Sequence, residues 1–367
     1  LGEVENTSSG QIQAGDGGSA GVNGCGAGGS VSLEGDETTT NAGTIMAGSG
    51  GTAKDDTGAT GGNGGSVNIS GNGHESARKT SNSGTVIGGA GGAGAVDNGG
   101  PPYYGAGNGG DGGSVTITNG HNGEYAAGEA ENSGHVSGGS GGSGGYTGAG
   151  GGDISGNGGH GGDVNVEGKN TRNNGTLEGG NGGDGGEGLD PGDQGGNGGH
   201  GGSVSVTGSL GPESESDTAE LPGTQRGGGA GVGGTGSGGN GDGGTGGSLK
   251  VRAKRRVSTG TGSHQSGGYI DFSIGDGTID LTNLEASAMV GEQGVVISAN
   301  GVIDLQGNMA GTYVIESPAG PIDINITDET QILLDPGVSL EDIMMPPPVV
   351  TVVAINEEIP FLPGWGV

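Results

Sequence analysis

The stretch Gly195–Gly208, GGNGGHGGSVSVTG, joins a glycine tract directly to a short alternating strand. Glycine loses more conformational freedom on folding than any other residue, so ordering such a tract is costly. A strand that alternates apolar and polar residues at matched positions nevertheless indicates an ordered repeat and argues against a disordered low-complexity chain. The same junction recurs as GGSVSLEG at 28–35, GGSVNISG at 64–71, GGSVTITNG at 112–120, GGDVNVEG at 161–168 and GGSLKVRA at 246–253.

A second short motif opens most of the repeats. It reads SSGQIQAG at 8–15, NAGTIMAG at 41–48, NSGTVIGG at 82–89, NSGHVSGG at 132–139 and NNGTLEGG at 173–180, and LPGTQRGG at 221–228 takes its place in the sixth repeat. Each unit therefore runs strand, glycine tract, strand and polar connector, with the variable lengths in the tract and the connector. Regular strands separated by variable inserts are typical of stacked rungs, so we predict an all-β parallel β-solenoid.

Beyond about residue 257 glycine becomes rarer and apolar alternation becomes dense. An Ile-Asp-hydrophobic triplet recurs there and favours further stacked rungs, and 281–292 is interpreted as strand and turn because no helix cap is present. We predict three parts. Residues 1–256 form six glycine-rich solenoid repeats, 257–345 form a denser, solenoid-like β-domain, and 346–367 form a proline-led C-terminal strand.

Within the inserts glycine falls in Gly-Gly-X triplets, as in GGNGGDGGEG at 179–188. A polyproline-II-type helix has three residues per turn, so every X lies on one edge and the other two edges permit close approach of neighbouring backbones. Because such a helix has no internal hydrogen bonds, its amides must pair with adjacent segments. Turn residues interrupt the middle of each tract, as in GLDPGDQ at 188–194. We therefore predict two polyglycine-II-type arms joined by a tip; the alternative is a flexible glycine-rich loop.

The charge of the chain is one-sided, with 11 Lys and Arg against 42 Asp and Glu and a net charge of −31. A strongly acidic surface repels nucleic acid, so no nucleic-acid partner is expected. The sequence has no apolar run of about 18 residues, so no membrane insertion is expected. Carboxylate oxygens are ligands that calcium prefers. Cys25 is the single cysteine, which rules out an intrachain disulfide.

The motif NAGTIMAG at 41–48 resembles the Asn-x-Gly-x-hydrophobic-x-Ala/Gly motif of filamentous-haemagglutinin-type adhesins. The resemblance covers the opening motifs and, loosely, 268–328. It implies a right-handed parallel β-helix on an extracellular protein. The glycine tracts depart from that motif and look more like the Gly-Gly-X arrays of mycobacterial glycine-rich surface proteins and of glycine-rich phage tip adhesins. Neither resemblance carries over a catalytic residue.

Three aspartates are candidate calcium ligands. The stretch ending at Asp184, GGNGGD, approaches the Gly-Gly-x-Gly-x-Asp turn of calcium-binding β-rolls, although Gly186 stands where that motif needs a large apolar residue. Asp190 and Asp193, in LDPGDQ, could share a Ca²⁺ ion at a tip. The alternative is that all three are solvated turn carboxylates.

Catalysis has little support in the sequence. His160 and His200 occupy equivalent X positions, where they could form a metal pair or serve as surface residues. Solenoid enzymes such as those that degrade pectin build sites from aspartates on adjacent rungs. The regular spacing of the corresponding aspartates here favours an outward polar face instead, and we predict that the protein is not an enzyme. These aspartates are Asp271, Asp280, Asp304 and Asp323.

The C-terminal segment 344–367, MMPPPVVTVVAINEEIPFLPGWGV, opens with three prolines that form a stiff spacer and cannot donate to a β-ladder. A β-branched strand and an apolar end follow. An open solenoid edge invites pairing with such a strand, so we predict strand addition to a neighbouring subunit; the alternative is that the tail caps its own domain. The predicted inter-subunit contacts are Val349, Val350, Val352, Val353, Ile355, Phe361 and Trp365.

These features together predict an extracellular or cell-surface structural protein. It would assemble with copies of itself into a filament or surface fibre that serves in a matrix, a biofilm or adhesion. A second reading is a monomeric adhesin that binds glycans or surfaces through its arm tips. A third is a polysaccharide-active solenoid enzyme.

Overall fold

The computed structural model describes the strands and most of each glycine tract. These are residues 2–19, 24–54, 58–71, 78–98, 105–120, 128–148, 153–208, 218–253, 256–259, 264–265, 270–274, 277–280, 295–298, 301–304, 312–315, 322–325, 330–334, 343–344 and 350–354. All regular elements in these ranges are β-strands. The described residues therefore contain no helix that is long and apolar enough to cross a bilayer.

The strands form three parallel sheets, and successive strands of one sheet come from successive repeats. Sheet A contains β1 (Val4–Asn6), β4 (Thr38–Asn41), β7 (Lys79–Asn82), β10 (Glu129–Asn132), β13 (Asn170–Asn173), β16 (Thr218–Leu221), β19 (Arg256–Thr259), β22 (Gly277–Asp280), β24 (Gly301–Asp304), β26 (Ile322–Asn325) and β28 (Ile343–Met344). Sheet B contains β2 (Gln11–Gln13), β5 (Thr44–Met46), β8 (Thr85–Ile87), β11 (His135–Ser137), β14 (Thr176–Glu178), β17 (Thr224–Arg226) and β20 (His264–Gln265).

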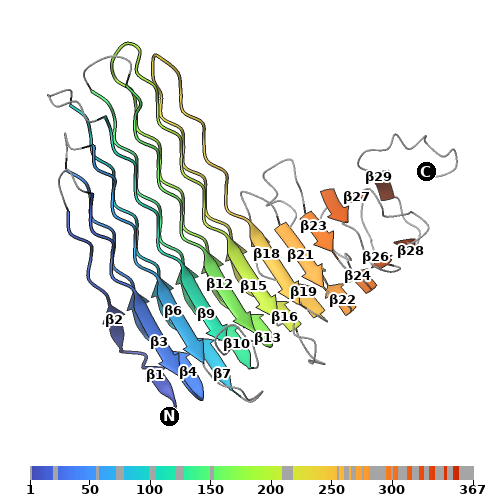
Figure 1. Ribbon diagram of the computed structural model, residues 1–367. Coiled ribbons are helices and arrows are strands. Elements are labelled where there is room, and N and C mark those ends of the chain that lie inside the picture. The colour runs from blue at the N-terminus through green and yellow to red at the C-terminus, as the bar shows by residue number, and fades with distance from the viewer. Residues whose placement is uncertain are drawn as a thin grey trace.

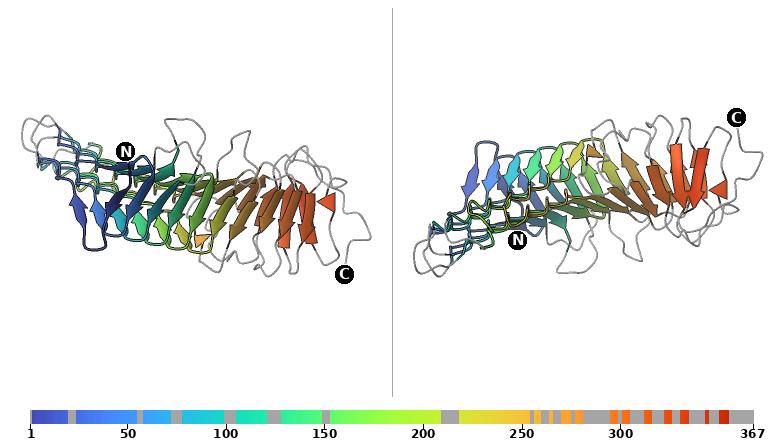
Figure 2. Two further views of the ribbon diagram at one scale, coloured as in Figure 1. Left: turned by 90° about the horizontal axis from the view of Figure 1, so that it is seen from below. Right: turned by 90° about the horizontal axis from the view of Figure 1, so that it is seen from above.

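Sheet C completes each rung. It contains β3 (Val31–Gly35), β6 (Val67–Gly71), β9 (Val115–Asn119), β12 (Val164–Gly168), β15 (Val204–Gly208), β18 (Leu249–Ala253), β21 (Ile270–Ile274), β23 (Val295–Ser298), β25 (Thr312–Ile315), β27 (Thr330–Leu334) and β29 (Val350–Ala354). The first and last rungs lie at opposite ends of one elongated stack (Figures 1 and 2). The predicted all-β parallel solenoid is therefore confirmed.

Equivalent residues of successive repeats pair one to one. Val164 of β12, for example, is in register with Val115 of β9 on one side and Val204 of β15 on the other. Sheets A and C continue across residue 256 without a break, because β18 pairs with β21 and β19 pairs with β22. The strands predicted beyond residue 257 thus extend the same stack, whereas the segment 281–292 lies outside the described residues.

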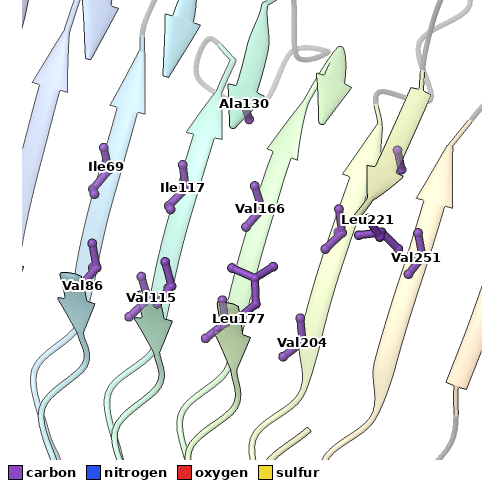
Figure 3. Packing of buried hydrophobic residues seen from close by; sticks show 14 of the residues in the cluster. Ile69, Val86, Val115, Ile117, Ala130, Val166, Leu177, Val204, Leu221 and Val251 are labelled. Atoms are coloured by element: carbon purple, nitrogen blue, oxygen red, sulfur yellow. The ribbon is translucent and has the colours of Figure 1, made fainter. Parts of the chain in front are cut away.

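The apolar core is a set of columns that run along the stack. Alternate residues of sheet C point inward, so Ile69, Ile117 and Val166 follow one another on neighbouring strands (Figure 3). Leu177 contributes from sheet B, and each of these four side chains is at most 1% exposed. Burying an aliphatic side chain of this size stabilises the fold by roughly 1.5–3 kcal/mol. One or two apolar residues per strand therefore suffice when every rung covers the one before it.

The asparagine of the opening motif forms a second, polar column inside the solenoid. Asn41 Nδ2 donates to Asn82 Oδ1 and Asn82 Nδ2 donates to Asn132 Oδ1, both at 2.7 Å. The column begins at Asn6 and ends at Asn173, and all of these side chains are buried. Each amide also bonds the turn that follows it, as Asn82 Oδ1 accepts from Gly84 N–H. The ladder fixes the corner between sheets A and B in the first five rungs.

The glycine tracts leave sheet B, run outward and return to sheet C, and they lie side by side on one side of the strand stack (Figure 1). We call the two halves of each excursion the outgoing and the returning arm. The described outgoing arms are 14–19, 47–54, 88–98, 138–148, 179–188 and 227–236, and the returning arms are 24–30, 58–66, 105–114, 153–163, 193–203 and 239–248.

Backbone hydrogen bonds from the arms repeat every three residues. In each triplet the first glycine donates within its own layer to the next repeat, as Gly141 N–H does to Asn181 O at 2.8 Å. The second glycine donates across to the other layer, as Gly142 N–H does to Gly110 O at 2.8 Å. The outgoing arms thus form one layer, the returning arms form another, and both layers are bonded throughout.

The close approach of the arms explains the two glycines in each triplet. A Cβ added at Gly141 or at Gly142 would come within 3.0 Å of a carbonyl oxygen on a neighbouring arm. Those neighbours are backbone atoms that are held by their own hydrogen bonds, so they have little freedom to move aside. The X position faces away from both neighbouring segments and admits any side chain, whereas the other two positions carry glycine or, as at Ala53, Ala59 and Ala95, the small alanine.

The sixth rung exchanges two inward positions. Leu221 stands where earlier rungs carry the ladder asparagine, and Gln225 pairs in register with Leu177 at an apolar position. The Gln225 side chain is fully buried, and its Oε1 and Nε2 atoms have no hydrogen-bond partner among the described residues. A buried amide without partners costs free energy, so this rung carries a local defect.

We expect Gln225→Leu to raise the free energy of unfolding by about 1–3 kcal/mol, because it removes two unsatisfied buried groups. Urea denaturation followed by circular dichroism measures the change. The reciprocal variant Leu177→Gln, which creates the same defect one rung earlier, should lower the stability. A loss of stability in Gln225→Leu would show that the amide has a partner in solution.

Candidate interaction surfaces

The outward face of the returning arms consists of capped amides. The N–H of most X residues from the second returning arm onward donates to the side chain of the X residue in the preceding arm. Asn157 N–H donates to Asn108 Oδ1, and Asn197 N–H donates to Asn157 Oδ1, both at 2.8 Å. Parallel columns do the same and contain Asn63, Asp111, His160, His200 and Thr245 in one, and Ser30, Ser66, Ser114, Asp163, Ser203 and Ser248 in the other.

His160 and His200 are brought together, as their equivalent positions allow. Their rings are stacked, with centroids 4.9 Å apart and an interplanar angle of 2°. His160 Nδ1 accepts from His200 N–H at 3.0 Å, and His200 Nδ1 accepts from Thr245 N–H at 2.9 Å. A neutral imidazole has one lone pair, and here Nδ1 uses it for the cap, which leaves the proton on Nε2. Binding a metal through either ring would therefore break a cap.

The outgoing-arm face is capped less completely. Side chains cap the N–H groups of Ser49, Gly229 and Val232. In the third and fourth arms the X residues include Ala90 and Ser140, whose N–H groups have no acceptor within the described ranges. This layer consequently presents backbone groups to its surroundings, whereas the returning layer presents side chains.

A shallow groove of about 630 Å³ runs along the solenoid where sheet B passes into the outgoing arms. Its floor is largely glycine backbone, and its two rims are the last outward residues of the sheet B strands and the first X residues of the arms. Glu178 and Arg226 face each other across 3.9 Å near one end. The middle is uncharged and includes Met46, Ile87, Ala90 and Ser137.

The predicted calcium ligands are engaged with the protein itself. Asp193 is buried, and its carboxylate accepts from the Thr147 hydroxyl at 2.9 Å and from Asp190 N–H at 3.1 Å. Asp184 is exposed and caps Val232 N–H. Among the described residues no three His, Cys, Asp or Glu side chains are grouped so that they could hold a metal ion. Calcium binding stays a prediction.

The aspartates considered as a catalytic ladder do not share one column. Asp280 and Asp304 are in register in sheet A, but Asp323 pairs with Val302, and Asp271 belongs to sheet C. Asp280 and Asp304 are thus the only two of the four that the strand register aligns.

The predicted C-terminal contacts are divided between described and undescribed residues. Val350, Val352 and Val353 belong to β29, which pairs in parallel with β27 of the same chain. Within the described strands β29 is the last member of sheet C and has one neighbour. Val349, Ile355, Phe361 and Trp365 lie outside the described residues. Their contact with another subunit stays a prediction.

The first rung presents a similar edge. Val31 N–H donates to Ser66 O of the next repeat at 2.9 Å, so alternation along a parallel strand turns the N–H groups of Ser32 and Glu34 to the opposite edge. No described strand pairs there. Leu33 is only half-buried, whereas its inner counterpart Ile69 is fully buried. The first rung thus exposes the strand edge and the core side chains that every inner rung uses to contact the rung before it.

In comparisons with known proteins, no family model, no curated protein sequence and no solved structure matches this chain. The function is therefore argued from its own residues.

Sequence reasoning missed the role of the X residues, which it interpreted as tolerated surface positions. The missed signal is chemical. The X residues of the returning arms that cap an amide are Asn, Asp, Ser or His, and all of these accept hydrogen bonds. Lys and Arg have no acceptor atom, and neither residue occupies a described X position of the returning arms.

We expect Asn157→Ala to expose Asn197 N–H and to speed its hydrogen exchange, because the cap that protects it is lost. The free energy of unfolding should fall by about 0.5–1.5 kcal/mol, the usual net value of one hydrogen bond. Exchange followed by mass spectrometry measures the local effect. Ser143→Ala is the matched control, since Ser143 caps no amide in the described structure. Equal exchange at 197 in all three proteins would contradict the capping role.

Sheet A carries an acid-sensitive ion pair. The hydrogen bond from Lys79 holds the pKa of Glu131 below its ordinary value of 4.5, and Ser133 and Asn174 assist. A carboxyl whose pKa is lowered by folding stabilises the protein above its unfolded pKa, and this contribution disappears as the pH falls through the folded pKa. The pair is partly exposed, so its contribution is small.

Lys79→Gln should therefore lower stability at pH 7 by about 0.2–1 kcal/mol. The difference from the unmodified protein should shrink below the ordinary pKa of 4.5, as Glu131 becomes protonated in both. Urea denaturation at a series of pH values checks this. Lys169→Gln removes a charge away from this pair and should give a pH-independent difference. A Lys79→Gln difference that stays constant down to acid pH would contradict the assignment.

Proposed function

We propose that this chain is an extracellular structural protein that assembles with copies of itself into a filament. The observation that carries the proposal is the free edge of β1, β2 and β3, which has the same form as the surface that joins the inner rungs. A rung that can be extended inside the molecule can be extended by another molecule in the same way. We assign no catalytic activity to it.

Partial burial of core side chains at the first rung supports this proposal. Leu33 and Ile12 pack against the core on one side and remain partly exposed on the other. Their counterparts Ile69 and Ile45 are completely buried. A second copy that stacked on β1–β3 would bury these side chains and would pair the open N–H and C=O groups, so the two contributions would act together.

We further propose that the arms are polyglycine-II helices. Hydrogen bonds in three directions with a three-residue period are what that conformation offers, because its backbone makes no bond to itself. Gly141, Gly142 and Ser143 illustrate the three directions: along the layer, across the layers and outward. Such arms are rigid spacers, and in a filament they would form a continuous fin beside the strand stack.

The proposal is tested on the purified chain by negative-stain electron microscopy and fibre diffraction. We expect filaments with a meridional spacing of about 4.7–4.9 Å, the distance between neighbouring strands. Glu34→Pro removes one N–H from the free edge of β3 and leaves the ladder to β6 intact, since proline is tolerated on an edge strand. This variant should fold, and its filaments should be shorter.

Glu34→Gln is the matched control, because it removes the charge and keeps the edge N–H. It should form filaments like the unmodified protein. A chain that stays monomeric at high concentration, or filaments of unchanged length in Glu34→Pro, would refute assembly through this edge.

A further inference from the structure

The arms end before the strands do. Sheet C has eleven strands, and its first six each follow a returning arm, the last of these being β18. Beyond it β20 ends at Gln265 and β21 begins at Ile270, which leaves no room for an arm. The sixth arm pair therefore has no following arm, although the strand stack beneath it continues.

This outer edge of the sixth arm pair carries unused hydrogen-bond donors. In the fifth arm, Gly182 and Gly185 donate to Gly229 O and Val232 O at 2.9 and 2.8 Å. The equivalent amides of the sixth arm, Ala230 and Gly233, have no acceptor among the described residues. Gly243 stands in the same situation in the returning arm. A row of unpaired backbone donors is the arm counterpart of an edge strand.

The first arm pair carries the complementary acceptors. In the second arm, Ser49 O accepts from Gly17 N–H and Asn63 O accepts from Gly28 N–H. The equivalent carbonyls of the first arm belong to Asp16 and Ala27, and no described donor reaches them. Among the described residues, the free edge of the sixth arm pair thus has N–H donors without acceptors, and the free edge of the first arm pair has carbonyl acceptors without donors.

Charge also favours contact at the sixth outgoing arm. Its X residues are Gly229, Val232 and Thr235, none of which is charged, in a chain with a net charge of −31. Copies of so acidic a protein repel each other over most of their surface, so an uncharged edge is where they can approach. Val232 is 68% exposed, which is unusual for an aliphatic side chain in this molecule.

We propose that the sixth arm pair of one copy is completed by the first arm pair of a second copy. A second copy in the same orientation and on the same axis cannot dock there, because β21 and β22 already occupy the next rung. Half a turn about a line that runs through the arms, parallel to the solenoid axis, removes this clash, because the second strand stack then lies beyond the arm tips of the first. The second copy then points its arms toward the armless rungs of the first.

That half turn also matches the chain direction. It exchanges the two arm layers and reverses both arms, so a returning first arm comes to lie beside an outgoing sixth arm and runs parallel to it. Parallel neighbours are the arrangement that each layer already uses. No arm is described beside the five strands of sheet C that follow its first six, so these strands offer space to the six arms of the partner.

The contact is heterologous, since it joins two different surfaces, and repeated it generates an open polymer. It rests on the proposed function in that the partner is another copy, but it uses the arms, whereas the proposed end-to-end contact uses the strands. Repeating the half turn twice returns a copy to the original orientation, further along the axis. The arm contact alone thus describes two interleaved rows. Two steps advance by twelve rungs whereas sheet C has eleven strands, so direct end-to-end pairing within a row is a separate mode of assembly.

Ala230→Pro tests the arm contact. Proline removes the edge N–H, and its φ of about −65° suits an extended three-residue helix. Position 230 already carries a Cβ, so no new close contact arises there. Ala230→Ser keeps the N–H and is one control. Ala93→Pro is the other: the Ala93 N–H also lacks a described acceptor, but it lies on the outer face of an inner arm.

Filaments of Ala230→Pro should have a mass per unit length about twofold lower in scanning transmission electron microscopy, because one of two rows is lost. Both controls should match the unmodified protein. Glu34→Pro should give the opposite result, filaments that keep the mass per unit length of the unmodified protein, because the arm contact alone generates an open polymer. Filaments of full mass in Ala230→Pro would overturn the arm contact while leaving the end-to-end contact standing.

A photo-reactive amino acid at position 232 of the full chain gives a second test of the arm contact that does not depend on a proline substitution. We expect it to cross-link to residues 24–30 of another copy, identified by mass spectrometry. Cross-links to 227–236 of another copy would indicate a symmetric contact and would overturn the proposal. The absence of intermolecular cross-links in assembled material, or cross-links to an added glycan, would overturn it as well.

Discussion

Saturation of backbone hydrogen bonds is the constraint on which this structure depends. An extended three-residue helix cannot bond to itself, so each of its amides must find a partner on a neighbouring segment. Here one amide in three is satisfied along the layer, one across the layers and, in the returning arms, one outward, as for Gly91, Gly92 and Asn157. The high glycine content follows from this requirement, since two of the three directions leave no room for a Cβ. Ordering one such tract in isolation costs much conformational entropy. The tract is ordered here because equivalent neighbouring tracts supply the hydrogen-bond partners of its amides.

The strand stack supplies the register that this saturation needs. A parallel ladder sets a constant distance between successive rungs and aligns equivalent residues one to one. The buried asparagine column reinforces this alignment at the corner between sheets A and B. Only the short sheet B strand separates that corner from the start of the arm. Because each arm begins directly after a sheet B strand, its three-residue phase is fixed where it starts. A one-residue slip in the sheet would turn a glycine outward and an X side chain into the layer.

Much of the fold could be predicted from sequence, because its signals are local and repeated. The alternating strand after each glycine tract and the Asn-x-Gly motif both mark real strands, in sheets C, A and B. The relation between repeats was harder to foresee. The asparagines of successive repeats lie 41 or more residues apart in most pairs, and only the stacking shows that Asn41 bonds Asn82. The unpaired Gln225 was equally invisible, since its isolation depends on the three sheets that surround it.

The outward amides also explain part of the acidity of the chain. Each capping residue must accept a hydrogen bond, and a carboxylate accepts without competing donors of its own. Asp16, Asp111 and Asp184 each cap the amide of the next arm, so these negative charges have a structural use. A sequence pattern of acidic residues among glycines resembles a calcium-binding turn, but the same residue type also serves where a backbone donor needs an acceptor. In the structure Asp184 caps Val232 N–H, which is the second of these uses, and calcium binding at this position stays a prediction.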